Sequence, residues 1–85
     1  MVFEILVPEP LEKEIEKKLD KVMIVRLHQR LRKLEIAPDI YGKPLRYPLA
    51  GTWEIRFENR WRVLYRIDYE KNYVFLTGFK HKDEM

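Results

Sequence analysis

A polar loop between residues 36 and 50 places two cations beside two aromatic rings. Lys43 and Arg46 are interleaved with Tyr41 and Tyr47 in this segment. Cations of this kind can bind phosphate groups, and tyrosine rings can stack on bases, so these are the residue types of a nucleic-acid contact. The same pattern would arise if the tyrosines packed over a sheet edge while the cations faced solvent. Both interpretations are open from these residues alone.

Three runs after this loop carry further arginines. The runs 52–57, 61–67 and 73–80 are rich in aromatic and β-branched residues and are bounded by polar turn residues. Such runs predict the strands of an antiparallel meander. Because side chains alternate between the two faces of a strand, one face of this meander is an apolar core and the other carries arginines.

The arginines of that face have two possible roles. Arg56, Arg62 and Arg66 could form a surface that binds an anion, since an arginine fork can hold two phosphate oxygens and stays charged. They could also form only cross-strand ion pairs on an exposed sheet face. The acidic partners in that second interpretation are Glu54, Glu58 and Asp68.

The elements before the meander must pack against its apolar face and cover it. The run 2–7 predicts a first strand, which ends at prolines. Two amphipathic helices follow, one through Leu11, Ile15 and Leu19 and a second over 21–35, with Asp20 as its cap. Charges over residues 1–35 are nearly balanced, eight basic against seven acidic, which is typical of a solvated face. His28 lies beside the apolar stripe and is expected to be a surface residue.

The composition limits the class of protein. Eighty-five residues predict one domain, 1–85, with a single core. The chain has no cysteine and only two histidines, so no metal site and no cofactor are expected. A formal charge of +3 is only mildly basic. There is neither a long apolar run nor a basic signal-peptide start, so we expect a cytoplasmic protein without a membrane partner.

The order of the motifs resembles the RelE/ParE superfamily of toxin-antitoxin toxins over nearly the whole chain. A strand and a helical hairpin precede four runs that carry this similarity. They are Gly42-Lys43-Pro44-Leu45, Leu49 to Arg56, Trp61 to Tyr65, and Leu76 to Lys82. The Trp-Glu-Ile-Arg and Gly-Phe-Lys-His-Lys segments resemble the HigB or phage branch, whereas the length and the hairpin resemble RelE.

The resemblance implies an α+β fold of order β-α-α-β-β-β, with a helical hairpin on one face of a four-stranded antiparallel sheet and the first strand beside the last. It also implies a cognate antitoxin protein that wraps an extended segment and a helix around the toxin and offers acidic side chains to its basic cleft. Most RelE-like and HigB-like toxins cleave mRNA in the ribosomal A site, whereas ParE-like toxins inhibit DNA gyrase. An inert relative that only pairs with its antitoxin is a third possibility.

If this chain is an mRNA endonuclease, its side chains must drive the attack of a 2′-hydroxyl on the adjacent phosphate without a metal. The family's basic residues correspond to Arg46, Arg56, Arg62, Lys80 and His81. We assign Arg56 and Arg62 to the phosphate oxygens. Lys80 and His81 are candidates for proton transfer, with the acid and the base left open. The remaining cations that would hold mRNA or ribosomal RNA are Lys43, Arg46 and Lys82, together with Tyr47.

This assignment requires Arg62 and Lys80 to share a face of the sheet. A three-residue turn that pairs Asp68 with Asn72 would set Arg62 opposite Gly78 and meet the requirement. A two-residue turn would direct Lys80 toward the helices, where an unpaired lysine is costly to bury. We therefore expect the first register.

The chain departs from the family pattern at two points. Glu54 stands where several relatives carry a basic residue, and the sequence lacks the C-terminal tyrosine that many RelE-like toxins have near the scissile phosphate. His81 or Tyr47 would then substitute for that tyrosine.

Overall fold

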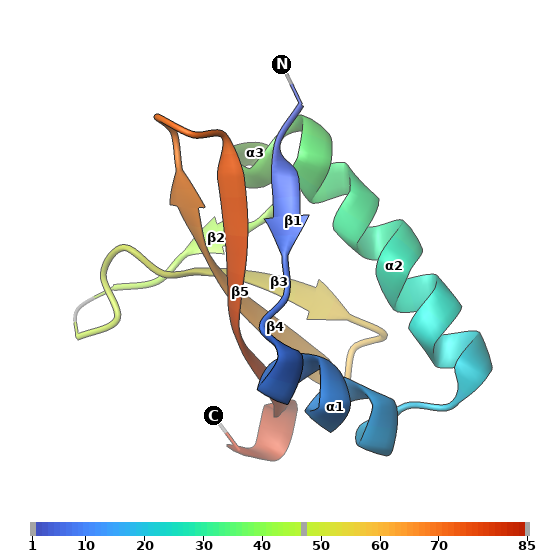
Figure 1. The fold of residues 1–85 in the computed structure, drawn as a ribbon. Helices are drawn as coiled ribbons and strands as arrows, with labels where there is room; N and C mark the ends of the chain where they lie inside the picture. The colour runs from blue at the N-terminus through green and yellow to red at the C-terminus, as the bar shows by residue number, and fades with distance from the viewer. Residues whose placement is uncertain (1, 47, 85) are drawn as a thin grey trace.

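The computed structural model describes residues 2–46 and 48–84, and its elements follow the predicted order with three additions, α3, β2 and η1 (Figure 1). Tyr47, which the sequence predicts to contact RNA, lies outside the described residues. In chain order the elements are β1 (Glu4–Leu6), α1 (Glu9–Lys18), α2 (Lys21–Ile36), α3 (Pro38–Tyr41), β2 (Lys43–Pro44), β3 (Trp53–Phe57), β4 (Trp61–Asp68), β5 (Tyr73–His81) and the short 3-10 helix η1 (Lys82–Glu84).

The strands form one mixed sheet in the order β1-β5-β4-β3-β2. The α+β class, the helical hairpin and the position of the first strand beside the last are confirmed. The expectation of four purely antiparallel strands was wrong in two respects. β1 runs parallel to β5, and β2 adds a fifth strand by pairing Lys43 with Glu54 and Pro44 with Trp53. A proline is tolerated in β2 because this strand lies at the sheet edge, where a missing N–H costs no ladder bond.

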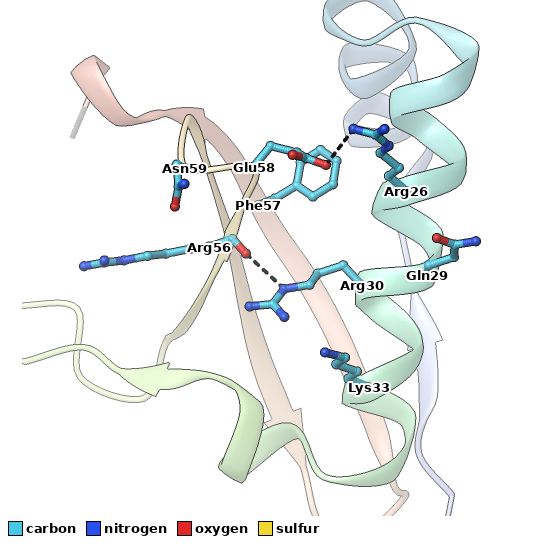
Figure 2. A pocket seen from close by; sticks show the side chains of 8 residues that line it. All are labelled: Arg26, Gln29, Arg30, Lys33, Arg56, Phe57, Glu58 and Asn59. Carbon is cyan, nitrogen blue, oxygen red and sulfur yellow. Dashed lines mark hydrogen bonds and ion pairs between the residues drawn. The ribbon is translucent and has the colours of Figure 1, made fainter.

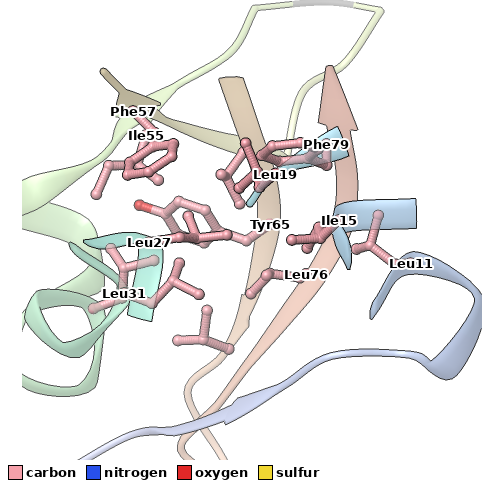
Figure 3. Close-up of a cluster of buried hydrophobic side chains, with 13 residues drawn as sticks. Leu11, Ile15, Leu19, Leu27, Leu31, Ile55, Phe57, Tyr65, Leu76 and Phe79 are labelled. Atoms are coloured by element: carbon pink, nitrogen blue, oxygen red, sulfur yellow. The ribbon is translucent and has the colours of Figure 1, made fainter. Parts of the chain in front are cut away.

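The core lies between the sheet and the helices (Figure 3). As the alternation predicted, β3 and β4 direct Ile55, Phe57, Val63 and Tyr65 into it, all nearly or completely inaccessible to solvent. The other core residues are Leu11, Ile15, Leu19, Leu27, Leu31, Leu34, Val74, Leu76 and Phe79. Burial of these side chains fixes the helices to one face of the sheet and leaves the other face without a helical cover.

Local signals set the helix ends. Asp20 caps α2 as expected, because its Oδ1 accepts a hydrogen bond of 2.9 Å from the Met23 backbone N–H. Pro10 is accepted in the first turn of α1, where the N–H has no helical partner. No helix in the described part of the chain is long and apolar enough to cross a membrane.

The segment after α2 is more ordered than its prolines suggested. The prediction of an irregular loop from residue 36 was wrong at α3, where Pro38 takes the first helical position and is buried. The Tyr65 hydroxyl donates a hydrogen bond of 2.6 Å to the Pro38 carbonyl oxygen. This bond ties the start of the loop to the centre of β4.

Candidate functional site

Three cations form a row across the face of the sheet that the helices leave uncovered. Arg56 of β3 pairs with Arg62 of β4, and Arg62 pairs in turn with Lys80 of β5. Directly paired residues point to the same face of a sheet, and neighbouring strands are about 4.8 Å apart. The structure therefore brings together three of the four predicted catalytic residues. We call Arg56, Arg62 and Lys80 the cation row.

A β-bulge brings Lys80 into register with Arg62. Leu64 pairs with Gly78 but the next residue, Tyr65, pairs with Leu76, so β5 holds one extra residue at Thr77. The expectation that Arg62 and Lys80 share a face is confirmed, although the predicted pairing of Arg62 with Gly78 was wrong. A bulge shifts the register by one residue, and its position is not visible in the hydrophobic pattern.

The turn between β4 and β5 also differs from the prediction. Asp68 pairs with Tyr73 rather than with Asn72, so the connection has four residues. Asp68 Oδ1 accepts hydrogen bonds from the backbone N–H groups of Glu70 and Lys71, at 3.0 and 3.1 Å. Asn72 has a positive φ of 58°, a conformation that asparagine tolerates better than most residues. With this turn alone, Lys80 would lie on the opposite face of the sheet from Arg62. The bulge at Thr77 returns Lys80 to the same face.

Glu54 lies against two members of the cation row. Its Oε1 is 3.1 Å from Arg62 Nε and 3.9 Å from Arg56 Nε. The Glu54 and Arg62 side chains are only 13% and 18% exposed, whereas that of Arg56 is 64% exposed. Arg62 Nη1 also donates to the Trp61 carbonyl oxygen at 3.4 Å. The carboxylate therefore holds the Arg62 guanidinium in place at the centre of the row.

The ion pairs of the alternative interpretation are present in part. Glu54 pairs with Arg56 and Arg62, as that interpretation required. Glu58 instead lies 3.4 Å from Arg26 of α2, and Asp68 is engaged in the turn. The sequence predicted Glu54 both as a departure from the family pattern and as an ion-pair partner on the arginine face. The structure confirms the second of these expectations for Glu54.

His81 points to the other face of the sheet from Lys80. It pairs with Trp61 across the β4–β5 ladder, and its ring meets the indole edge-on at a centroid distance of 5.1 Å. Its Nδ1 lies 3.4 Å from an oxygen of the Asp83 carboxylate. Consecutive residues of a strand face opposite sides, so the structure does not bring His81 into the cation row.

Lys80 lies on the side of the row nearer to α1. A hydrogen bond from Lys18 lowers the pKa of the Glu14 carboxyl, and the Lys80 ammonium adds a smaller electrostatic contribution in the same direction. Lys82 follows in η1, where it is exposed and its backbone N–H donates to the Arg60 carbonyl oxygen at 2.7 Å.

The loop cations flank the row from the opposite edge. Lys43 of β2 pairs with Glu54, so it stands on the same face as the row. Arg46 is exposed in the segment that projects from this edge (Figure 1), and its carbonyl accepts a bond of 2.9 Å from the Leu49 N–H. Lys43 and Arg46 therefore lie on the β2 side of the row, and Lys80 and Lys82 at its β5 side.

Tyr65 holds the start of this loop in place from the helix-facing side of the sheet. Burial raises the pKa of its hydroxyl, which is held protonated against the Pro38 carbonyl. Gly42 passes so close to it that an added Cβ would overlap the Tyr65 oxygen. Only glycine permits this approach, and the close contact fixes where β2 begins. Sequence reasoning assigned Tyr65 to the core and missed this second role.

The fold is that of RelE/ParE-type toxins, as the comparisons with known proteins establish. Residues 10–85 match the family model described as "ParE toxin of type II toxin-antitoxin system, parDE", and the chain belongs to this toxin family. No curated protein sequence matches the chain.

Three solved structures illustrate the similarity. The toxin-antitoxin complex RelBE2 of Mycobacterium tuberculosis contains a chain that is 28% identical, with a TM-score of 0.79, and the match covers 96% of this chain and 100% of that one. A mutant of the Escherichia coli RelE toxin in the free state is 25% identical, with a TM-score of 0.74 and coverage of 93% and 82%. A YoeB/ParE toxin of Agrobacterium tumefaciens, at 16% identity and a TM-score of 0.75, covers 93% and 98% and shows the shared fold alone.

Proposed function

We propose that this toxin is a ribosome-dependent endonuclease that cuts mRNA in the A site by metal-independent attack of a 2′-hydroxyl on the scissile phosphate. The cation row is the observation that supports this proposal. Three cations from three strands, side by side on an open face, are suited to a phosphodiester whose charge grows during reaction. The proposal implies that the toxin acts in the cytoplasm, where it meets translating ribosomes.

Arg62 is the proposed centre of the phosphate site. Its guanidinium is oriented by Glu54 and by the Trp61 carbonyl, so little side-chain freedom is lost when an anion binds. Arg56 is more exposed and is placed to bind the same phosphate from the β3 side. An arginine fork remains charged and can contact two phosphate oxygens at once.

Glu54 and Lys80 are the proposed partners in proton transfer. They stand on β3 and β5, on either side of Arg62, and the two strands are about 10 Å apart. Lys80 is directly opposite Arg62, whereas Glu54 is opposite Leu64 and reaches Arg62 diagonally, so a phosphate on Arg62 would have a proton acceptor and a proton donor on its two sides. A carboxylate can accept a proton as a general base, and a lysine ammonium can donate one as a general acid.

The reaction then proceeds in one displacement. The 2′-hydroxyl gives its proton to the Glu54 carboxylate while its oxygen forms a bond to phosphorus. The bond from phosphorus to the 5′-oxygen breaks, and that oxygen takes a proton from Lys80. The products are a 2′,3′-cyclic phosphate and a 5′-hydroxyl end, and the arginines balance the added charge on the phosphate oxygens.

The remaining predicted residues have supporting roles in this proposal. Lys43, Arg46 and Lys82 hold the RNA backbone on either side of the row, with Tyr47 available for stacking. His81 reaches the rim of the site from the other face, so it acts on the RNA only if its side chain turns away from Trp61. The antitoxin, a partner seen in complexes of related toxins, would block the site with acidic side chains.

Primer extension on mRNA in a translating extract tests the proposal. The toxin is purified and treated with EDTA, which is then removed. It should create new 5′ ends within translated codons, and only when ribosomes are translating. Arg62→Ala should abolish these ends. Intact mRNA with normal translation would contradict the proposal.

Inhibition of DNA gyrase without bond cleavage is the second candidate function. Two observations favour it: the family match to ParE toxins and the carboxylate of Glu54, which neutralises part of the cation row. A gyrase supercoiling assay run beside the extract assay separates the two functions. Loss of supercoiling with intact mRNA supports gyrase inhibition, and failure of both activities with retained antitoxin binding identifies an inert relative.

A further inference from the structure

A second basic surface lies beside the cation row, between helix α2 and strand β3 (Figure 2). It is an open groove of about 640 Å³. Its lining residues are Arg26, Gln29, Arg30 and Lys33 of α2, and Arg56, Phe57, Glu58 and Asn59 of β3 and the following turn. We call it the α2–β3 groove.

The α2 wall of this groove is a stripe of cations. Arg26, Arg30 and Lys33 recur at intervals of four and three residues, so they share one face of the helix. They extend along about 10 Å of the helix axis at 1.5 Å per residue. Like charges one turn apart repel each other, so nothing in helix formation itself favours this stripe.

The charge balance seen in the sequence conceals this stripe. Helix α1 contains four glutamates and three lysines, whereas α2 contains five basic residues and a single acid, Glu35. The basic and acidic side chains counted together over residues 1–35 are therefore separated in space. Within the groove Glu58 is the one acidic lining residue, against four cations.

Two contacts cross the groove and hold its walls together. Arg30 Nε donates a hydrogen bond of 3.1 Å to the Arg56 carbonyl oxygen, and Arg26 Nη1 lies 3.4 Å from Glu58 Oε1. Glu58 and Asn59 both have positive φ, at 52° and 57°, in the turn that presents this carboxylate. A glutamate in that conformation is strained, so the turn is held by its surroundings.

Two positively charged side chains of the groove, Arg30 and Lys33, remain available to bind a ligand. Among the described residues, neither Arg30 nor Lys33 forms an ion pair. The contact of Arg30 uses Nε and leaves its terminal nitrogens directed along the groove (Figure 2). Lys33 lies 5.6 Å from the centre of the Tyr41 ring.

The groove is continuous with the cation row through Arg56. The guanidinium of this residue points away from α2, onto the face of the row, while its carbonyl oxygen faces Arg30 (Figure 2). Cations therefore continue from Lys80 and Arg62 over the edge of β3 to α2. One polyanion could contact both surfaces.

We propose that the α2–β3 groove binds the sugar-phosphate backbone of RNA beyond the scissile phosphate, through Arg30 and Lys33. An RNA backbone is favoured over an acidic peptide because the groove is open, continues the cation row and offers charge without an apolar anchor: Phe57 is 3% exposed. The RNA can be the message itself or ribosomal RNA. This inference rests on the proposed function for the identity of its ligand.

The test compares two double variants of α2 with the same change in charge. Arg30→Gln with Lys33→Gln removes two cations from the groove. Lys21→Gln with Arg32→Gln removes two exposed cations from the same helix outside it. Binding is measured to ribosomes without mRNA, and to ribosomes carrying mRNA that ends at the A-site codon or extends past it, each over a range of KCl concentrations.

The groove variant should bind about tenfold or more weakly at low salt, and its slope of log K against log salt should fall by about one to two. The control variant should bind ribosomes and cleave mRNA like the parent. Weaker binding already without mRNA assigns the contact to ribosomal RNA, and weaker binding only with extended mRNA assigns it to the message. Either result supports the proposal.

Equal binding of the groove and control variants would overturn the proposal. Weakened binding of the antitoxin with unchanged binding of ribosomes would also overturn it, and would assign the groove to the protein partner. If the parent binds ribosomes through the groove but never cleaves mRNA, the proposed nuclease function fails while the groove assignment holds. If the parent binds no ribosome, both fail.

Discussion

The two faces of the sheet differ in what holds their side chains. Along β4, Val63 and Tyr65 point toward the helices and are completely buried, whereas Arg62, Leu64 and Arg66 point to the uncovered face. Burial of apolar area accounts for the first set, at roughly 25 cal/mol per Å². An ion pair such as Glu54–Arg62 adds little net stability compared with apolar burial, so stability gives no comparable account of the arginines.

This difference separates residues that support the fold from residues proposed to act on RNA, even between neighbours in the chain. Substitution on the helix-facing side should change stability and leave the chemistry of the folded molecule intact. Substitution on the uncovered face should do the reverse. The predictions below test that separation, from the largest expected effect to the smallest.

Arg62→Ala should lower the rate of mRNA cleavage by about 10²- to 10³-fold, because it removes the central donor to the phosphate oxygens. The melting temperature should fall less than in a core variant, because the Glu54 carboxylate that loses Arg62 can still pair with Arg56. Single-turnover cleavage and thermal unfolding of one preparation measure both quantities. Val63→Ala is the matched control, and it should show the opposite pattern. Equal loss of stability in the two variants would remove the distinction between the faces.

Leu34→Ala should lower the free energy of unfolding by about 2–5 kcal/mol, because this side chain is completely buried between α2 and the sheet. Cleavage per folded molecule should be unchanged at a temperature where the variant is folded. Urea unfolding followed by circular dichroism gives the first quantity. A specific loss of cleavage in folded Leu34→Ala would show that the core tunes the site.

Tyr65→Phe should cost about 1–3 kcal/mol, because it leaves the buried Pro38 carbonyl without its donor. Burial raises the pKa of this hydroxyl, so the unfolded chain loses the proton first as pH rises. The stability that the hydroxyl contributes is therefore fully present below about pH 10 and declines above it. Unfolding measured between pH 7 and 11 should show a steeper alkaline decline in the parent than in Tyr65→Phe; parallel curves would contradict this.

His81→Ala should reduce cleavage only severalfold, because the ring packs on Trp61 on the helix-facing side. Lys80→Ala, one residue away in the cation row, should reduce cleavage by 10²-fold or more. The ratio of the two single-turnover rates measures how strictly the chemistry is confined to one face. A larger effect for His81 would mean that its side chain turns into the site during reaction.

The sequence predicted the structure correctly where the spacing of apolar residues indicates which side chains are buried. Alternation in β3 and β4 predicted Ile55, Phe57, Val63 and Tyr65 as core residues, and Asp20 was recognised as a cap. These predictions succeeded because the hydrophobic effect and helix capping act locally along the chain.

Features set by distant contacts could not be predicted. The bulge at Thr77 depends on how β5 fits the rest of the sheet. The basic stripe of α2 was missed because charges were counted over both helices together, and the groove itself depends on the packing of α2 beside β3. His81 was grouped with Lys80 because both correspond to basic residues of the family, although alternation along a strand already separates them.

Cleavage of an mRNA with a single 2′-deoxyribose at the scissile nucleotide tests the central proposal most directly. The message is bound to ribosomes with the modified codon in the A site, and the toxin is first treated with EDTA and then dialysed, so that it adds no metal ion of its own. We predict that the all-ribose message is cut to a 2′,3′-cyclic phosphate and a 5′-hydroxyl end, while the deoxy message stays intact. Equal cleavage of the two messages, or cleavage of neither, would contradict 2′-hydroxyl attack at the cation row.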